Sequence, residues 1–331
     1  MIHSLHSANK IIKNNMLKKD KKGFEFSFGW IFAIIVGAVV IFLAIYASSK
    51  FVFTERRVQD TETAKELGII LSPLETGLEE SKKTIIAMPG ETRIYNRCVS
   101  SGNFGSQKIS VASRSGIGKE WQNPGVESTF YNKYLFSSAV SEGQDFYFFT
   151  KSFNMPFKIG DLIFMISENE KYCFVKPPRE IEDEINDLDL RSVVNLTNFV
   201  KECGKGMISV CFASVGCDVD VNIQSKSVKK TGKTVYYEDS LVYGAIFSDP
   251  IIYECQTQRL MKRASELGLV YLAKSEYVAA SSNGCSSNMQ GLLISYSNKT
   301  AVSDSAGLKD IYLISQELED RNEAIVSCKI F

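Results

Sequence analysis

Eight cysteines are the residues of this 331-residue chain best suited to chemistry. They are Cys98, Cys173, Cys203, Cys211, Cys217, Cys255, Cys285 and Cys328. Their number is even, and no Cys-x-x-Cys pair indicates a zinc ribbon or a redox site. We therefore expect disulfide bonds. Buried free thiols are the alternative, because an unpaired cysteine also packs as a small hydrophobic residue.

Histidine is restricted to the N-terminal tail, where it occurs as His3 and His6. The rest of the chain therefore lacks a residue for a Ser–His–Asp or Cys–His catalytic group, and for a zinc site that contains histidine. This excludes most classes of hydrolase. We expect a protein that is not an enzyme and has no catalytic, cofactor-binding or metal-binding residues.

Two segments match part of a ligand-binding motif. TGKT (231–234) ends like a phosphate-binding P-loop, but Ser227 stands where the first glycine is required. DVDVN (218–222) opens like a calcium loop, but Ile223 replaces the turn glycine. We interpret both segments as strands and their turns. The chain has 38 basic and 38 acidic residues, so no basic excess would attract nucleic acid.

Residues 28–47 determine on which side of a membrane the cysteines are expected. These twenty residues contain no charged side chain. A helix of this length is ~30 Å long, about the thickness of the hydrocarbon core of a bilayer. A secretory signal usually has a shorter apolar region nearer the N-terminus, and a buried core helix would show a polar face. We therefore expect a transmembrane helix at 24–50 that contacts lipid through residues 28–47.

Positive charge concentrates before this apolar run. The lysines on that side are Lys10, Lys13, Lys18, Lys19, Lys21 and Lys22, whereas the basic residues after the run are mixed with acids. The positive-inside rule places the tail or leader, residues 1–23, in the cytoplasm and residues 51–331 outside the cell membrane. All eight cysteines fall on the external side, where disulfides persist. Asn195 and Asn298 open N-x-T sequons there and are candidate glycosylation sites.

Residues 51–88 have the pattern of a helical stalk. Ala64 and Leu67 belong to an apolar stripe at helical spacing between residues 58 and 71. Ser72-Pro73 has the pattern of a new helix start, which predicts an interruption there and a second helix to about Thr84.

Residues 89–331 predict an external α+β domain with a mixed sheet. The turn cluster at 100–103 separates short runs rich in Val, Ile, Phe and Tyr. Strands are expected at 145–153 (DFYFFTKSF), 161–166 (DLIFMI), 209–215 (SVCFASV), 218–223 (DVDVNI), 234–239 (TVYYED) and 241–247 (LVYGAIF). Helices are expected at 180–194 and in the C-terminal third: from Pro250 through the stripe Leu260, Ala264, Leu267 and Tyr271, then at 287–297 and 307–325.

The last two helices suggest one cysteine pairing. If they form an antiparallel hairpin, Cys285 before the first and Cys328 after the second lie at the same end. We therefore predict a Cys285–Cys328 bond. The other pairings stay open.

Lys21-Lys22-Gly23-Phe24, directly before the apolar run, resembles the leader of type IV pilins and archaellin-like proteins. The resemblance implies that a dedicated peptidase cuts between Gly23 and Phe24 and leaves the apolar helix at the mature N-terminus. Phe28 stands where the family usually has an acid. The strings KGFEFSFGWIFAII, ETRIYN, GCDVDV and AIFSDPIIYECQTQRLMKR also resemble membrane-anchored, cysteine-containing archaeal surface proteins.

A second segment, SFNMPFKIGDLIFM (152–165), is similar to the serine-containing box of membrane signal peptidases. In that family a serine is the nucleophile and a lysine is the base. Here Asn154 stands at the serine position and cannot attack, and the candidate lysines, Lys262 and Lys274, fall on a predicted helix.

The sequence therefore predicts a single-pass surface protein with a structural or interaction role, with a pilin-like subunit as one variant. Its expected partners are a second copy of the chain or another surface protein. A degenerate membrane peptidase of the Ser–Lys type is the alternative function.

Overall fold

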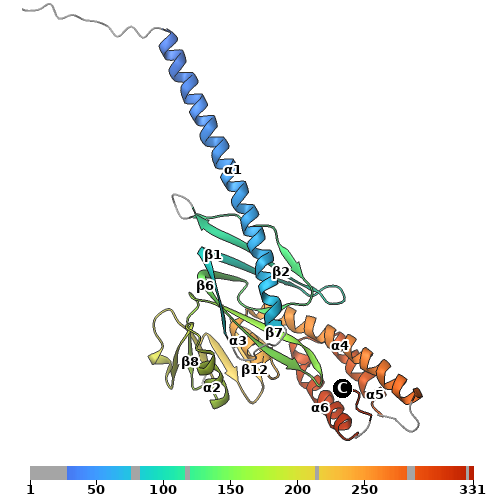
Figure 1. Cartoon of the computed structure of the whole chain (residues 1–331). Coiled ribbons are helices and arrows are strands. Elements are labelled where there is room, and N and C mark those ends of the chain that lie inside the picture. The colour runs from blue at the N-terminus through green and yellow to red at the C-terminus, as the bar shows by residue number, and fades with distance from the viewer. Residues whose placement is uncertain (1–27, 76–82, 116–119, 213–215, 282–287, 326–327) are drawn as a thin grey trace, which may run out of the picture. The chain divides into compact units, whose positions relative to one another are not determined.

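A computed structural model describes residues 28–75, 83–115, 120–212, 216–281, 288–325 and 328–331. The chain divides into two compact units, Met1–Thr54 and Glu55–Phe331. The described residues form an α+β protein with two sheets and a helical C-terminal part, as expected from the sequence (Figure 1). Gly23 and Phe24 lie outside the described residues.

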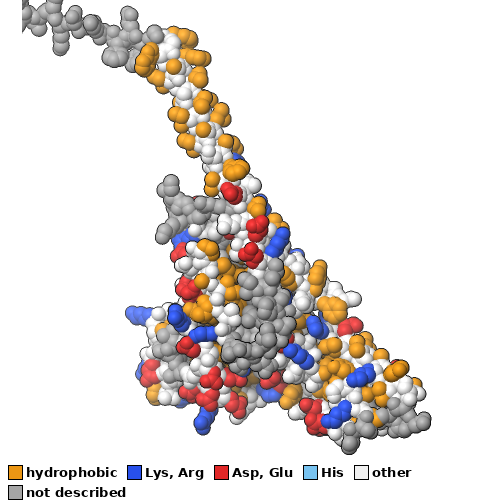
Figure 2. Space-filling model, viewed as in Figure 1, with side chains coloured by type: hydrophobic (Ala, Val, Ile, Leu, Met, Phe, Trp, Pro, Cys, Tyr) orange, Lys and Arg blue, Asp and Glu red, His pale blue; other side chains and the backbone are white. Residues whose placement is uncertain are grey.

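The first unit contains the N-terminal half of helix α1 (Phe28–Glu75). Its apolar side chains are exposed, and no part of its most hydrophobic 18-residue stretch is buried. Hydrophobic side chains cover the visible side of this half (Figure 2). In length and composition, α1 is able to cross a membrane.

The predicted helix interruption at Ser72-Pro73 is wrong, because α1 continues without a break to Glu75. Pro73 lies in the last turn, two residues before the helix ends at Glu75. Strand β1 begins at Thr84, so the helical stalk predicted for residues 51–88 is also too long.

The first sheet lies in the second unit and has seven strands in the order β3-β2-β1-β6-β7-β5, with β4 paired to β2. Its strands are β1 (Thr84–Val99), β2 (Ser106–Ser115), β3 (Glu120–Trp121), β4 (Ser128–Phe130), β5 (Tyr134–Phe136), β6 (Val140–Asn154) and β7 (Lys158–Ser167). All pairs are antiparallel except β5 with β7.

Both faces of this sheet are buried around β6 and β7, which explains the continuous apolar run in β6. Phe146 and Phe148 share a core with Leu67 of α1 on one face. Tyr147 and Phe149 belong to the larger core on the other face, where Phe149 packs edge-on against Tyr243 at 5.8 Å between ring centroids. Successive strand residues point to opposite faces, so every position between two covered faces becomes apolar.

The second sheet has six strands in the order β13-β12-β11-β10-β8-β9. They are β8 (Tyr172–Val175), β9 (Val193–Thr197), β10 (Ile208–Cys211), β11 (Val219–Asn222), β12 (Ser227–Lys230) and β13 (Lys233–Tyr236). Helix α2 (Arg179–Leu188) connects β8 to β9, and the short helix η1 (Val200–Glu202) follows β9. Thr231 and Gly232 form the hairpin turn between β12 and β13, with φ angles of 50° and 76°. This confirms a strand-and-turn interpretation of TGKT.

The helices of the C-terminal part are α3 (Leu241–Phe247), α4 (Pro250–Ser281), α5 (Gln290–Ala301), η2 (Ser305–Gly307) and α6 (Leu308–Glu323). The strand predicted at 241–247 is wrong, because this segment is α3 and all its residues are buried. A short apolar run that is buried on every side has no periodicity to distinguish helix from strand. Leu260 and Ala264 are buried as the stripe on α4 predicted.

Three disulfides join six of the seven described cysteines, and the seventh, Cys328, is also disulfide-bonded. Cys98–Cys255 links the end of β1 to α4, Cys173–Cys203 links β8 to the end of η1, and Cys211–Cys217 closes a short loop after β10. Cys285 lies outside the described residues, so its pairing with Cys328 stays a prediction.

Candidate functional site

The two lysines considered as catalytic bases have structural partners. Lys262 Nζ donates to the carbonyl oxygens of Ser100 at 2.6 Å and Gly102 at 2.9 Å. Lys274 Nζ donates to the carbonyl oxygen of Ile330 at 2.5 Å. Asn154 ends strand β6, and the chain turns at Met155 toward β7. This geometry gives the peptidase hypothesis no support.

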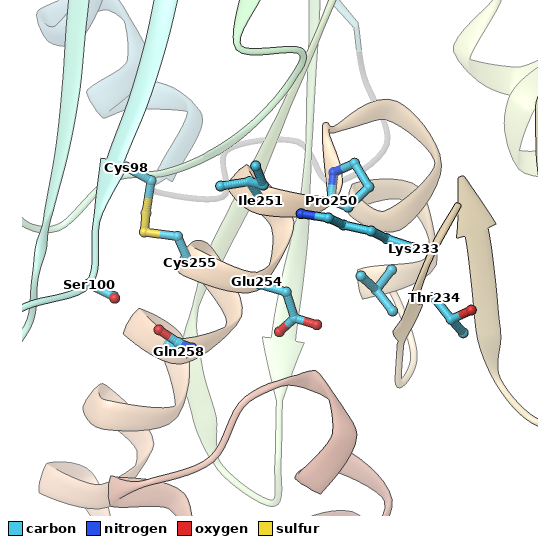
Figure 3. A pocket seen from close by; sticks show the side chains of 10 residues that line it. Cys98, Ser100, Lys233, Thr234, Pro250, Ile251, Glu254, Cys255 and Gln258 are labelled. Atoms are coloured by element: carbon cyan, nitrogen blue, oxygen red, sulfur yellow. A yellow bond between two sulfur atoms is a disulfide. The ribbon is translucent and has the colours of Figure 1, made fainter. Parts of the chain in front are cut away.

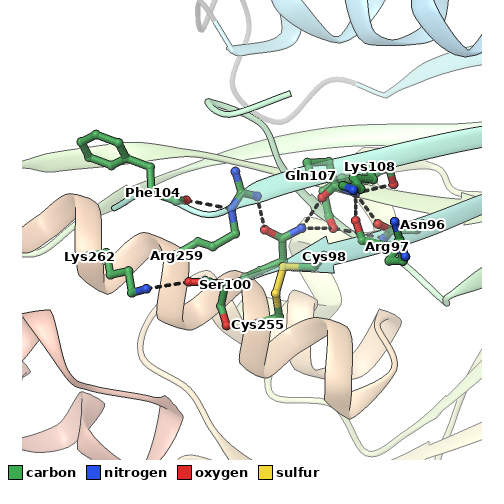
Figure 4. Close-up of a disulfide and its surroundings, with 12 residues drawn as sticks. Asn96, Arg97, Cys98, Ser100, Phe104, Gln107, Lys108, Cys255, Arg259 and Lys262 are labelled. Atoms are coloured by element: carbon green, nitrogen blue, oxygen red, sulfur yellow. Dashed lines mark hydrogen bonds between the residues drawn. A yellow bond between two sulfur atoms is a disulfide. The ribbon is translucent and has the colours of Figure 1, made fainter. Parts of the chain in front are cut away.

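Lys262 instead holds the loop between β1 and β2, residues 100–105, against helix α4 (Figure 4). The sequence predicted a turn at 100–103 but gave no reason to connect it with α4. The loop begins two residues after Cys98, whose disulfide partner Cys255 lies on α4. The Cys98–Cys255 disulfide and the ammonium group of Lys262 therefore both attach the β1–β2 loop to α4.

Arg259, one turn from Cys255 on α4, makes the third connection. Its side chain is completely buried. Nε donates to the Phe104 carbonyl at 3.1 Å, Nη2 to the Tyr131 carbonyl at 2.8 Å, and Nη1 to the Lys133 carbonyl at 2.7 Å. One planar guanidinium thus joins the β1–β2 loop to the segment between β4 and β5. Burial lowers the pKa of Arg259 to about 10, so the group remains charged at neutral pH.

A buried chain of amides continues from Arg259 toward the sheet. Arg259 Nη1 donates to Gln256 Oε1 at 2.7 Å, and Gln256 donates in turn to Gln107. Gln107 Nε2 donates to Asn96 Oδ1 at 2.5 Å, and Asn96 Nδ2 donates to Ser137 Oγ at 2.7 Å. A buried network in which each amide has a partner fixes one arrangement of the elements that contribute to it.

Gly105 completes the loop and tolerates no larger residue. Its φ angle is +59°, a conformation that disfavours residues with a side chain. A Cβ atom there would also lie 2.3 Å from the Val99 carbonyl oxygen. The loop is therefore fixed by its own backbone as well as by α4.

A surface groove of about 490 Å³ lies along this loop, and we call it the aromatic groove. Its lining residues are Val99, Ser101, Gly102, Asn103, Phe104, Gly105, Ser106, Lys108, Thr129 and Tyr131. Phe104 and Tyr131 are the two aromatic residues, and their side chains stay 42% and 67% exposed although their backbones are bound by Arg259. This is the candidate functional site.

A second cavity, of about 590 Å³, lies between α4 and β13 and is also lined by the Cys98–Cys255 disulfide (Figure 3). Its acidic residue, Glu254, is already used, because both carboxylate oxygens accept hydrogen bonds from Ser305. The lining of this cavity contains no aromatic residue, in contrast to that of the aromatic groove.

Cys211, Cys217 and Asp220 come close enough together to be considered as a metal site. The two cysteines form a disulfide, which leaves no thiolate to bind a metal. Asp220 accepts hydrogen bonds from the backbone N–H groups of Gly216 and Cys217 at 3.2 and 3.0 Å. The cluster is thus a disulfide-closed turn with a carboxylate cap.

The two sequons fall in different elements. Asn195 lies in β9 and Asn298 is exposed on α5. The hydroxyl of Thr300 in the second sequon is buried and donates to the Tyr296 carbonyl at 2.8 Å. Glycosylation at Asn195 and Asn298 stays a prediction.

Comparison of the chain with protein-family models, with curated proteins and with solved structures finds no match.

Proposed function

We propose that this chain is a single-pass surface protein whose external, disulfide-stabilised domain has a structural or interaction role. The observation that carries the proposal is the first half of α1, where nineteen residues from Phe28 to Tyr46 expose almost only apolar side chains. Exposed apolar surface of this extent is unfavourable in water and favourable in a bilayer.

The disulfides and the charge pattern support the external orientation of the domain. Three disulfides lie in the second unit, and such bonds persist outside the cytoplasm. The lysines before the apolar segment favour a cytoplasmic N-terminus. These two arguments are independent, because one rests on residues 10–22 and the other on residues 98–255.

A pilin-like subunit is the variant of this role that we propose first. The resemblance of Lys22-Gly23-Phe24 to a pilin leader supports it, because a cut after Gly23 would leave the apolar segment at the mature N-terminus. Helix α1 adds support, since one uninterrupted helix contains both the apolar segment and Ala64 and Leu67, which pack on the sheet.

A charge in the apolar segment tests the membrane anchor. Replacing Val39 and Val40 together with arginine adds about 5–7 kcal/mol to the cost of membrane insertion, at ~2.5–3.5 kcal/mol for each arginine. We expect the variant to leave the membrane fraction after alkaline carbonate extraction. The matched control is Val302→Arg, because Val302 is an apolar residue of the second unit that is 87% exposed. Retention of the double variant in the extracted membrane, or release of the control, would contradict the proposal.

A further inference from the structure

We propose that the aromatic groove binds an uncharged carbohydrate, with a pyranose ring stacked on Tyr131 and Phe104 and its hydroxyl groups bound at the rim. This inference rests on the proposed function, because it names the chemical class of ligand that an external interaction domain would take.

The aromatic side chains supply the stacking surface. Tyr131 is 67% exposed and Phe104 is 42% exposed, and both line the same groove. One face of a pyranose ring presents C–H groups, which carry a small positive charge and pack on the negative face of an aromatic ring. The contact requires a free aromatic face, which large aromatic side chains in a core do not provide.

The polar rim suits a ligand rich in hydroxyl groups. Ser101, Asn103 and Thr129 line the groove and offer two hydroxyls and an amide, which can both donate and accept hydrogen bonds. Within the described ranges of the chain, no group forms a hydrogen bond with these three side chains. Their bonding capacity is therefore available to a ligand.

The charge at the groove favours an uncharged ligand. Lys108 is the charged residue of the lining. Its ammonium lies 3.7 Å from the Glu127 carboxylate, which is also paired with Arg97 at 2.6 Å. A phosphate or carboxylate ligand would have to compete with Glu127 for Lys108, whereas a neutral sugar would not.

The groove is rigid before any ligand arrives. Arg259 binds the carbonyl groups of Phe104 and Tyr131, and Lys262 binds those of Ser100 and Gly102. The backbones below both aromatic rings are thus fixed to α4, and the Cys98–Cys255 disulfide fixes the start of the loop. A site that needs no ordering on binding loses less free energy when it binds. Its volume of about 490 Å³ also lies within the usual range for small ligands, roughly 300–1,000 Å³.

The test uses the full chain, purified in a detergent without a sugar headgroup. Saturation-transfer NMR is recorded with maltotetraose, cellotetraose and chitotetraose as probes. We expect saturable binding of at least one of them, and a loss of about tenfold or more in affinity on Tyr131→Ala. This substitution removes the ring but keeps the carbonyl that Arg259 binds, so the fold is preserved and the melting temperature should stay close to that of the parent.

The matched control is Tyr277→Ala, because Tyr277 lies on α4 outside the groove and is 72% exposed. It should leave the affinity unchanged. The inference is overturned if none of the three probes binds saturably, or if Tyr131→Ala and Tyr277→Ala have equal effects. Failure of the carbonate-extraction test would instead refute the membrane anchor and leave a sugar-binding result intact, so the two proposals fail separately.

Discussion

Arg259 is the largest completely buried side chain in the described domain, and its partners are carbonyl and amide oxygens. A guanidinium without a carboxylate partner is costly to bury, and several strong acceptors at fixed positions must offset this cost. The three carbonyl acceptors belong to two loops that are far apart in the sequence, so their hydrogen bonds to Arg259 fix these loops relative to each other. Arg259 therefore positions the backbone of the aromatic groove although it does not line the groove itself.

Replacement of Arg259 by methionine should lower the free energy of unfolding by about 3 kcal/mol, because three buried carbonyl groups lose their donor at roughly 1–3 kcal/mol each, partly offset by removal of the buried charge. Urea unfolding followed by tryptophan fluorescence measures this change. Hydrogen exchange at residues 100–105 should increase as well. The control is Arg179→Met on α2, whose side chain is 92% exposed and should change stability by less than about 0.5 kcal/mol. Equal effects of both variants would show that Arg259 has no special role.

Buried tyrosines make the domain sensitive to alkaline pH. Burial raises the pKa of Tyr237 to about 12 and raises those of Tyr172, Tyr243, Tyr253 and Tyr296 as well. In the unfolded chain these phenols titrate near pH 10, so the unfolded state binds fewer protons above that pH. Stability is therefore fully present below about pH 10 and falls as the pH rises above it.

Spectrophotometric titration at 295 nm tests this expectation. The exposed tyrosines should ionise first and reversibly, and the buried set should ionise only together with unfolding, which circular dichroism monitors in parallel. Ionisation of all fourteen tyrosines near pH 10 in a protein that is still folded would contradict the burial on which the prediction depends.

At the scale of elements, the disulfides contribute unequally because they close loops of different length. Cys98–Cys255 spans 157 residues and Cys211–Cys217 spans 6. The loop-entropy relation gives about 5 kcal/mol for the first and about 2 kcal/mol for the second. The first bond also joins the sheet to α4 directly below the aromatic groove.

The double variant Cys98→Ser/Cys255→Ser should therefore lose about 3 kcal/mol more stability than Cys211→Ser/Cys217→Ser, measured as the difference in urea unfolding under non-reducing conditions. The second pair is the control for loss of any disulfide. An equal or smaller effect of the long-range pair would mean that the hydrogen bonds of Gln256, Arg259 and Lys262 hold α4 against the sheet without the disulfide.

Elements with a clear local signal were predictable from the sequence. The stripe on α4 is found as expected because helical spacing reflects burial on one side, and the strands of DFYFFTKSF and DLIFMI are found because Phe, Tyr and Ile favour strands even where both faces are buried. The strand predicted at 241–247 is α3, because an apolar run buried on all sides has no period. The aromatic groove was not predictable, since Arg259 and Phe104 are 155 residues apart and no local pattern connects them.

At the scale of the whole molecule, the chain combines an exposed apolar helix segment with a mildly acidic domain, which has 31 basic and 36 acidic residues between positions 55 and 331. The apolar segment exposes a surface that is unfavourable in water, whereas the domain encloses its own hydrophobic core. The central proposal is therefore the topology of the chain, in which an N-terminal membrane anchor precedes an external, disulfide-stabilised domain.

The measurement that tests this proposal most directly is the intact mass of the protein isolated from its native cells, with thiols alkylated before and after reduction. We predict no alkylation before reduction and eight adducts after it, on a chain that begins at Phe24. A chain that begins at Met1 with blocked thiols would contradict pilin-type processing and keep the external domain. Eight adducts without reduction would contradict the external, disulfide-stabilised domain itself.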